Sequence, residues 1–177
     1  MSARQAAGRG REAGFTLLEL VVVICIVAFG ATALLDRLWR YQEMAEKAGM
    51  EYTMTIVRTA LALETAHALV RGGGKDLDRM AQANPMSWMS TLPPTYLGEF
   101  DGPAPEGASG WYYDRVARQL VYLPKRSDNL EPMADGTKAI RLRVQRAPSG
   151  RSEGVKDDPN QWTPALVLVQ PYRWFAN

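Results

Sequence analysis

Hydrophobic residues are concentrated in one early stretch of the chain. Residues 15–35 read FTLLELVVVICIVAFGATALL, and Glu19 is the one charged side chain among them. As a helix these residues extend roughly 31 Å, about the thickness of the hydrocarbon core of a bilayer. The pattern predicts a membrane-spanning helix, whose transmembrane part we assign to residues 15–38.

The helical pattern continues beyond this segment. Residues 39–71 contain no proline and a single glycine, and most of them favour helix. Only the later half of residues 39–71 is expected to face a core. Residues 37–51 mix apolar and charged side chains, as expected for a helical stalk. Three glycines at 72–74 should end the helix after about 55 residues. The apolar stripe comprises Tyr41, Ala45, Ala48, Tyr52, Ile56, Leu63 and Val70, broadened in the second half by Met50, Met54, Val57 and Leu61.

The remainder of the chain predicts a small sheet. Residues 72–109 form a proline-rich connection with a short helix at 77–83, and residues 110–177 form a head domain. Expected strands are 110–114, 119–123, 139–145 and 166–170, with a possible continuation at 172–175, and a polar loop lies at 148–160. The sequence therefore predicts an α+β fold, in which a long N-terminal helix packs by its second half on a small antiparallel sheet.

A specific motif surrounds the start of the apolar run. A basic leader ends in Gly14, and Phe-Thr-Leu-Leu-Glu-Leu and the apolar residues follow. This arrangement resembles the type IV pilin and type II secretion pseudopilin class. The resemblance implies that a prepilin peptidase removes the leader, residues 1–14, after Gly14, and that Phe15 becomes an N-methylated N-terminus. It also implies that Glu19 pairs with the Phe15 amine of a neighbouring subunit, which would offset the cost of a carboxylate in lipid.

Charge predicts the orientation. Arg4, Arg9 and Arg11 precede the apolar run, so the positive-inside rule puts the N-terminus in the cytoplasm and the head in the periplasm, with one pass through the inner membrane. From residue 15 onward, 18 basic and 18 acidic side chains cancel. Such a neutral body gives no general footprint for nucleic acid. An ordinary signal peptide is the competing interpretation, but its cleavage site would follow the apolar core, where this chain continues into Asp36 and Arg37.

Candidate chemistry is sparse. His67 is the sole histidine and Cys25 the sole cysteine, so neither a histidine-dependent triad nor a zinc site is expected. Asp157 and Asp158 offer a weak calcium site, although a solvated turn explains them equally well. Arg141, Arg143 and Trp111 are the residues through which the head would bind a ligand, if it binds one. No other metal or cofactor is expected.

These observations favour a structural subunit over an enzyme. We expect a minor pilin or pseudopilin of a type IV pilus or a type II secretion pseudopilus, with the prepilin peptidase, sister subunits, the inner membrane and an assembly platform as partners. A membrane-helix proline and a C-terminal cysteine pair, common in major pilins and in many pilus subunits respectively, are absent here, which favours the minor or pseudopilin branch. The alternatives are an adhesive or DNA-uptake minor pilin and a membrane-anchored periplasmic enzyme.

Overall fold

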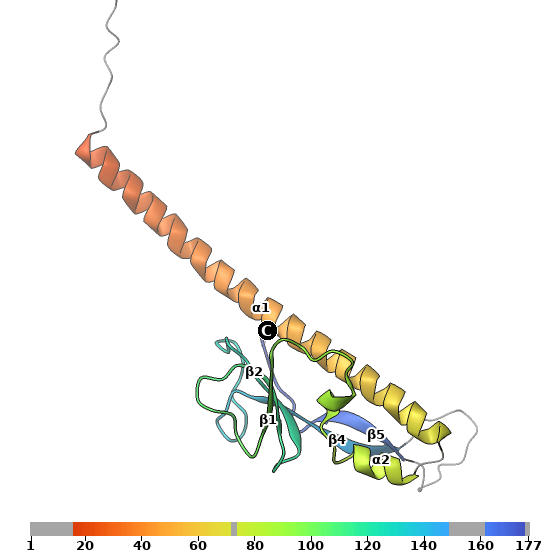
Figure 1. The fold of residues 1–177 in the computed structure, drawn as a ribbon. Coiled ribbons are helices and arrows are strands. Elements are labelled where there is room, and N and C mark those ends of the chain that lie inside the picture. Colours follow the sequence, from red (N-terminus) through yellow and green to blue (C-terminus); the bar gives the residue numbers. More distant parts are fainter. Residues whose placement is uncertain (1–15, 72–73, 149–161, 176–177) are drawn as a thin grey trace, which may run out of the picture. The chain divides into compact units, whose positions relative to one another are not determined.

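A computed structural model describes residues 16–71, 74–148 and 162–175 of the chain. Contacts divide the chain into two compact units, with the boundary between Gln42 and Glu43. The elements, shown in Figure 1, are α1 (Leu17–Val70), α2 (Gly74–Met80), a 3₁₀ helix η1 (Pro85–Trp88), and strands β1 (Tyr96–Phe100), β2 (Gly110–Asp114), β3 (Gln119–Leu123), β4 (Ile140–Pro148) and β5 (Trp162–Leu168).

The long helix is confirmed. α1 has 54 residues, and its start is fixed by Thr16, whose hydroxyl oxygen accepts a hydrogen bond from the Glu19 backbone N–H at 3.2 Å. Thr16 and Glu19 have the spacing of a capping box, in which a threonine cap is followed three residues later by glutamate. α2 begins at Gly74, three residues before the predicted start of the short helix, so its predicted bounds were wrong.

Five strands form one sheet in the order β1-β2-β3-β4-β5. The pairings are antiparallel except for β1 with β2, which is parallel. The predicted bounds of β2 and β3 are confirmed, whereas β4 runs three residues further and β5 begins four residues earlier than expected. The mostly antiparallel α+β fold is therefore as predicted.

Two features at the margins of the sheet differ from the prediction. β1 was missed, because its short sequence YLGEF contains Gly98 at a positive φ of 104° and has an irregular register with β2. The predicted strand at 172–175 was wrong, because Pro171 interrupts the chain after β5 and Trp174 forms only an isolated bridge, with Leu130.

The second half of α1 packs along one face of the sheet (Figure 1). The residues that broadened the predicted stripe are the ones in the core: Met50, Met54, Val57 and Leu61 are all at most 5% exposed. The sheet contributes Trp111, Leu120, Tyr122, Ile140, Leu142, Val144 and Leu166.

Most of the remaining predicted stripe residues face away from the core, whereas Ile56 is half-buried. Tyr41, Tyr52, Leu63 and Val70 are between 59% and 88% exposed. The prediction assigned them to the wrong face of the helix. Both faces of the second half of α1 carry apolar residues, and periodicity alone does not say which face packs on the sheet. The prediction that packing begins only in the later half was also wrong, because burial on α1 begins at Glu43.

Candidate assembly helix

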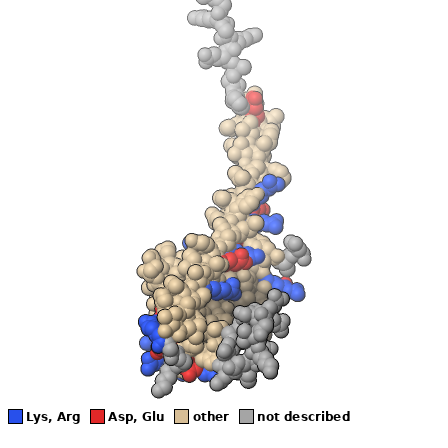
Figure 2. All heavy atoms as spheres, turned by 90° about the vertical axis from the view of Figure 1, so that its right-hand side faces the viewer, with Lys and Arg blue, Asp and Glu red and all other residues tan. Residues whose placement is uncertain are grey.

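The first half of α1 is apolar on every side. An 18-residue window of this helix has a mean hydropathy of 2.6, and none of that window is buried. Figure 2 shows that most of this part is covered by uncharged side chains. By length and composition, α1 is the one helix in the described ranges that could cross a membrane. An apolar surface of this kind needs either lipid or other apolar helices around it.

Glu19 is exposed on this apolar helix, between Leu18, which is 73% exposed, and Leu20. Its position in the first turn places the carboxylate where the free N–H groups of the helix favour negative charge. Gly14 and Phe15 lie outside the described residues, so cleavage and methylation there stay predictions.

The outer, exposed face of α1 from Tyr41 to Val70 carries no charge. Exposed residues at intervals of three or four follow one line along the helix, and the flanking charged side chains lie off that line. Thr55 and Thr59 lie on it, and each hydroxyl donates to a backbone carbonyl four residues earlier. This outer face comprises Tyr41, Ala45, Ala48, Tyr52, Thr55, Thr59, Leu63, Ala66 and Val70.

The inner face of α1, which packs against the rest of the head, begins with the buried side chain of Glu43. Glu43 is 1% exposed, and its carboxylate accepts hydrogen bonds from the Asn129 backbone N–H at 2.9 Å, from Asn129 Nδ2 at 2.7 Å and from Trp174 Nε1 at 2.9 Å. Burial raises the pKa of the Glu43 carboxyl, but these hydrogen bonds and the nearby charge of Lys138 outweigh it and leave the pKa below its ordinary value.

Two further glutamates of α1 accept from other segments. Glu46 accepts from the Tyr122 hydroxyl at 3.1 Å and from the backbone N–H groups of Lys125 and Arg126, at 2.5 Å and 3.1 Å. Glu51 accepts from the Tyr172 hydroxyl at 3.1 Å. The predicted charged stalk is therefore, from Glu43 onward, an anchoring surface for the head.

Sequence reasoning missed these carboxylates. The available signal was their spacing: residues 43, 46 and 50 lie on one helix face, so two acids continue the line of the core methionine Met50. Nothing local shows that the donors exist, because Asn129 and Trp174 are 86 and 131 residues away.

In the head, Trp111 does not reach the surface. It is 1% exposed, and its ring lies 4.8 Å from that of Tyr122 in the core. A ligand has no access to it in this fold.

Arg141 and Arg143 alternate with the buried residues of β4 on the opposite face of the sheet, and both are half-buried rather than fully exposed. Arg141 pairs with Asp135 at 2.6 Å. Hydrogen bonds from Thr137, together with this guanidinium, lower the pKa of Asp135 to about 2. Arg143 donates through Nη2 to the Ala117 carbonyl at 3.2 Å, and its Nε is buried without an acceptor among the described residues.

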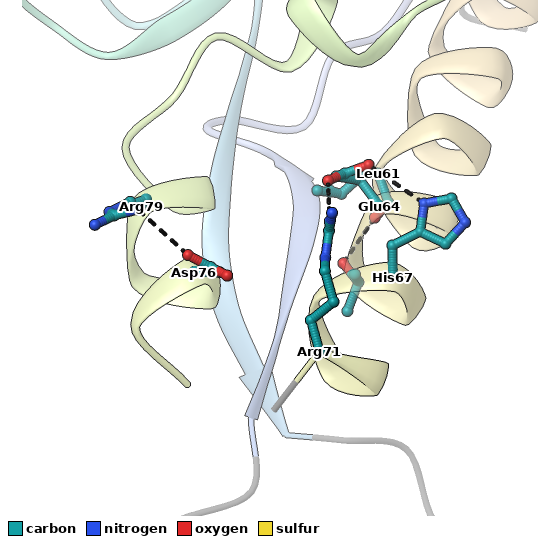
Figure 3. A network of polar contacts seen from close by, with 7 residues as sticks. Leu61, Glu64, His67, Arg71, Asp76 and Arg79 are labelled. Atoms are coloured by element: carbon teal, nitrogen blue, oxygen red, sulfur yellow. Dashed lines mark hydrogen bonds and ion pairs between the residues drawn. The ribbon is translucent and has the colours of Figure 1, made fainter. Parts of the chain in front are cut away.

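His67 lies on the exposed side of α1 near its end. Its Nδ1 is 3.6 Å from Glu64, and Arg71 contacts the same carboxylate at 3.1 Å, as Figure 3 shows. In the described ranges no three His, Cys, Asp or Glu side chains group as a metal site, and Asp157 and Asp158 lie outside those ranges.

Comparison with protein families gives a match in the N-terminal part of the chain. No curated protein and no solved structure matches the chain. Residues 9–35 match the family model described as the prokaryotic N-terminal methylation motif, so the chain carries the signature of type IV pilins and pseudopilins.

Proposed function

We propose that this chain is a minor pilin or pseudopilin, a structural subunit that assembles through α1 into a type IV pilus or a type II secretion pseudopilus. The match of residues 9–35 to the methylation motif carries the proposal. The motif implies processing by a prepilin peptidase and assembly with other pilins. The continuous helix that begins at Leu17, within the matched region, supports it.

The proposed assembly step is an ion pair. Cleavage after Gly14 creates an amine on Phe15, which is then methylated and stays positive. A carboxylate in the apolar part of α1 costs free energy in lipid unless it is partnered. Insertion scales put the cost of a charged residue at the centre of a membrane helix at roughly 2.5–3.5 kcal/mol. Glu19 gains that partner when the Phe15 amine of a neighbouring subunit lies beside it. The charge thus favours the assembled state over the free subunit.

Before assembly the subunit is held in the inner membrane. The three leader arginines keep the N-terminus cytoplasmic, and the head lies in the periplasm, from which the assembly platform moves subunits into the filament. The role is structural: the peptidase performs chemistry on the chain, and the chain performs none.

The outer face of α1 supports assembly through this helix. An exposed stripe without charge from Tyr41 to Val70 is unusual for a surface that faces only water. Its intervals of three and four residues are those at which one helix packs against another. We propose that α1 of sister subunits covers part of it.

Two measurements on the full chain test the proposal. Intact mass of protein from cells with an active prepilin peptidase should correspond to residues 15–177 plus one methyl group. A Gly14→Val variant, which blocks close approach of the peptidase to the backbone, should keep the leader. A mature chain that still begins at Met1 would refute the proposed processing.

Incorporation is measured separately. Glu19→Gln should still be cleaved, but it should be largely lost from the sheared filament fraction when it competes with the wild-type chain. Cleavage without any loss of Glu19→Gln from filaments would contradict the proposed ion pair and leave processing intact.

One observation favours a second function, a ligand-binding head. Among the described residues the half-buried Arg143 has no carboxylate partner, whereas Arg141 is paired with Asp135 and Trp111 is buried. Such a site would recognise an anionic group. Arg143→Lys should then reduce adhesion or DNA uptake at normal piliation, and Arg141→Lys should not; equal, unchanged uptake in both would exclude it.

A further inference from the structure

Two segments that are distant in sequence lie together on the inner face of α1. Residues 125–131 follow β3, and residues 172–175 follow β5. They pair with each other through the Glu131 backbone N–H to the Arg173 carbonyl and the Phe175 N–H to the Asn129 carbonyl, both at 3.0 Å. The bridge between Leu130 and Trp174 lies between these two bonds.

α1 holds this pair through carboxylates. A single oxygen, Glu43 Oε1, accepts both the Asn129 backbone N–H and the Trp174 indole N–H, each at 2.9 Å. Glu46 holds the start of the first segment and Glu51 the start of the second. Lys47 adds a bond from its Nζ to the Trp174 carbonyl at 3.2 Å.

We propose that Glu43 and Glu46 form a carboxylate clasp, which fastens residues 125–131 and 172–175 to α1 as one unit that opens and closes together, with Glu43 joining the two segments. The bonds to Glu43 are charge-assisted and shielded from water, so removing its charge leaves several donors unsatisfied at once. Because one oxygen serves both segments, loss of that oxygen's charge loosens both.

The unit is closed at neutral pH. The groups that face Glu43 are Asn129, Trp174 and Lys138, and together they hold the pKa of the Glu43 carboxyl below its ordinary value, so Glu43 is ionised at neutral pH. Around Glu46 and Glu51 lie the phenols of Tyr122 and Tyr172, whose pKa values are raised by burial and by the neighbouring carboxylate. Both phenols therefore remain donors.

Opening would expose apolar surface as well as polar groups. Leu130 and Trp174 are 2% and 3% exposed and belong to the main core, so the open unit uncovers part of the inner face of α1. The clasp therefore decides whether residues 125–131 and 172–175 are packed on α1 or detached from it.

Hydrogen exchange of the full chain in detergent micelles, read by mass spectrometry, tests the clasp. Glu43→Gln should speed amide exchange in peptides covering 125–131 and 172–175 by a similar factor, about tenfold or more for lost bonds to a charged group. Exchange in β2 and β3 should stay within about twofold, as for local rather than global opening. Glu51→Gln is the matched control, because its carboxylate is half exposed and accepts only from Tyr172; it should change residues 172–175 alone and weakly.

A milder variant keeps the test decisive if Glu43→Gln folds poorly. Trp174→Phe removes one donor and retains a large ring, and it should speed exchange in residues 125–131 although the substitution lies in the other segment. Acceleration confined to the substituted segment, or an equal rise throughout the sheet, would overturn the clasp.

Discussion

The indole N–H of Trp174 donates to Glu43 Oε1 at 2.9 Å. This bond joins the segment that follows β5 to the first buried residue of α1. Both side chains are at most 3% exposed. A carboxylate is stable at such a site only if hydrogen bonds replace its water, and Asn129 supplies the others. The Glu43 carboxylate of α1 and the N–H groups of Asn129 and Trp174 thus supply each other's hydrogen-bond partners.

This arrangement predicts an acid-sensitive part of the stability. The pKa of Glu43 is lowered in the folded chain, so its contribution is fully present above its ordinary pKa of 4.5 and is lost as pH falls through the lower folded-state value. Glu43→Gln should cost roughly 2–3 kcal/mol near pH 7. Thermal unfolding from pH 7 to pH 3 checks it: the difference between the wild type and the variant should shrink only in the acid range. A difference that is constant throughout would contradict the assignment.

Core packing predicts a contrast between two methionines of α1. Met50 is 1% exposed and Met44 is 52% exposed. Met50→Ala should destabilise the head by about 2–5 kcal/mol, because it removes buried apolar atoms and leaves a cavity, whereas Met44→Ala should change stability by less than about 0.5 kcal/mol. Chemical denaturation of both variants gives the comparison, and similar losses would mean that the buried face of α1 has been misassigned.

The turn into β2 predicts an intolerant glycine. Gly110 has φ of 129°, and a Cβ there would lie 2.2 Å from the Thr95 carbonyl oxygen, which accepts the Trp111 N–H. Gly110→Ala should cost more than about 1–3 kcal/mol, because the strain of positive φ is joined by a backbone clash. Gly136 has φ of 78° and open space around it. Gly136→Ala should therefore lose only the free energy that a positive φ costs an alanine. Equal melting temperatures for the two variants would count against the clash.

The sequence predicted the elements whose determinants are local. β2 and β3 combine apolar and aromatic residues with a polar turn between them, and their bounds were correct. β1 could not be found because it is a five-residue edge strand whose pairing with β2 is parallel and irregular. Local pattern carries little information about such a pairing.

The candidate site was predictable in its first half and not in its second. The motif around Glu19 is contiguous, so the sequence displays it directly. The roles of Glu43 and Glu46 depend on Asn129, Trp174 and the 125–126 backbone, which only the folded chain brings near them. For the same reason the sequence could not say that Trp111 is buried or that Arg141 is paired.

The uncharged outer face of α1 predicts separable effects on assembly and stability. Tyr52 is 68% exposed on that face, and Val116 is 74% exposed in the turn between β2 and β3. Tyr52→Glu should leave the melting temperature of the isolated chain nearly unchanged and reduce incorporation into filaments several-fold, because a charge would be buried against a sister helix. Val116→Glu adds the same charge away from the helix and should incorporate normally. Equal incorporation of both variants would refute the proposed helix contact.

Glu19 has two possible contributions at the start of α1, and a pair of variants separates them. As the third residue after Thr16 it belongs to a capping box, and as a carboxylate it is the proposed partner of the Phe15 amine. Glu19→Gln retains a side chain suited to the capping box and removes the charge, whereas Thr16→Val removes the hydroxyl acceptor at a cost of about 1 kcal/mol and keeps the charge.

Each variant is compared with the wild type in cells that cleave all three chains, by its share of the sheared filament fraction. Thr16→Val should assemble almost normally and Glu19→Gln should not, because fraying of one helical turn is repaired by packing whereas a missing charge is not. If Thr16→Val lost incorporation to the same degree, the glutamate would matter for starting the helix, and the ion pair would have to be abandoned.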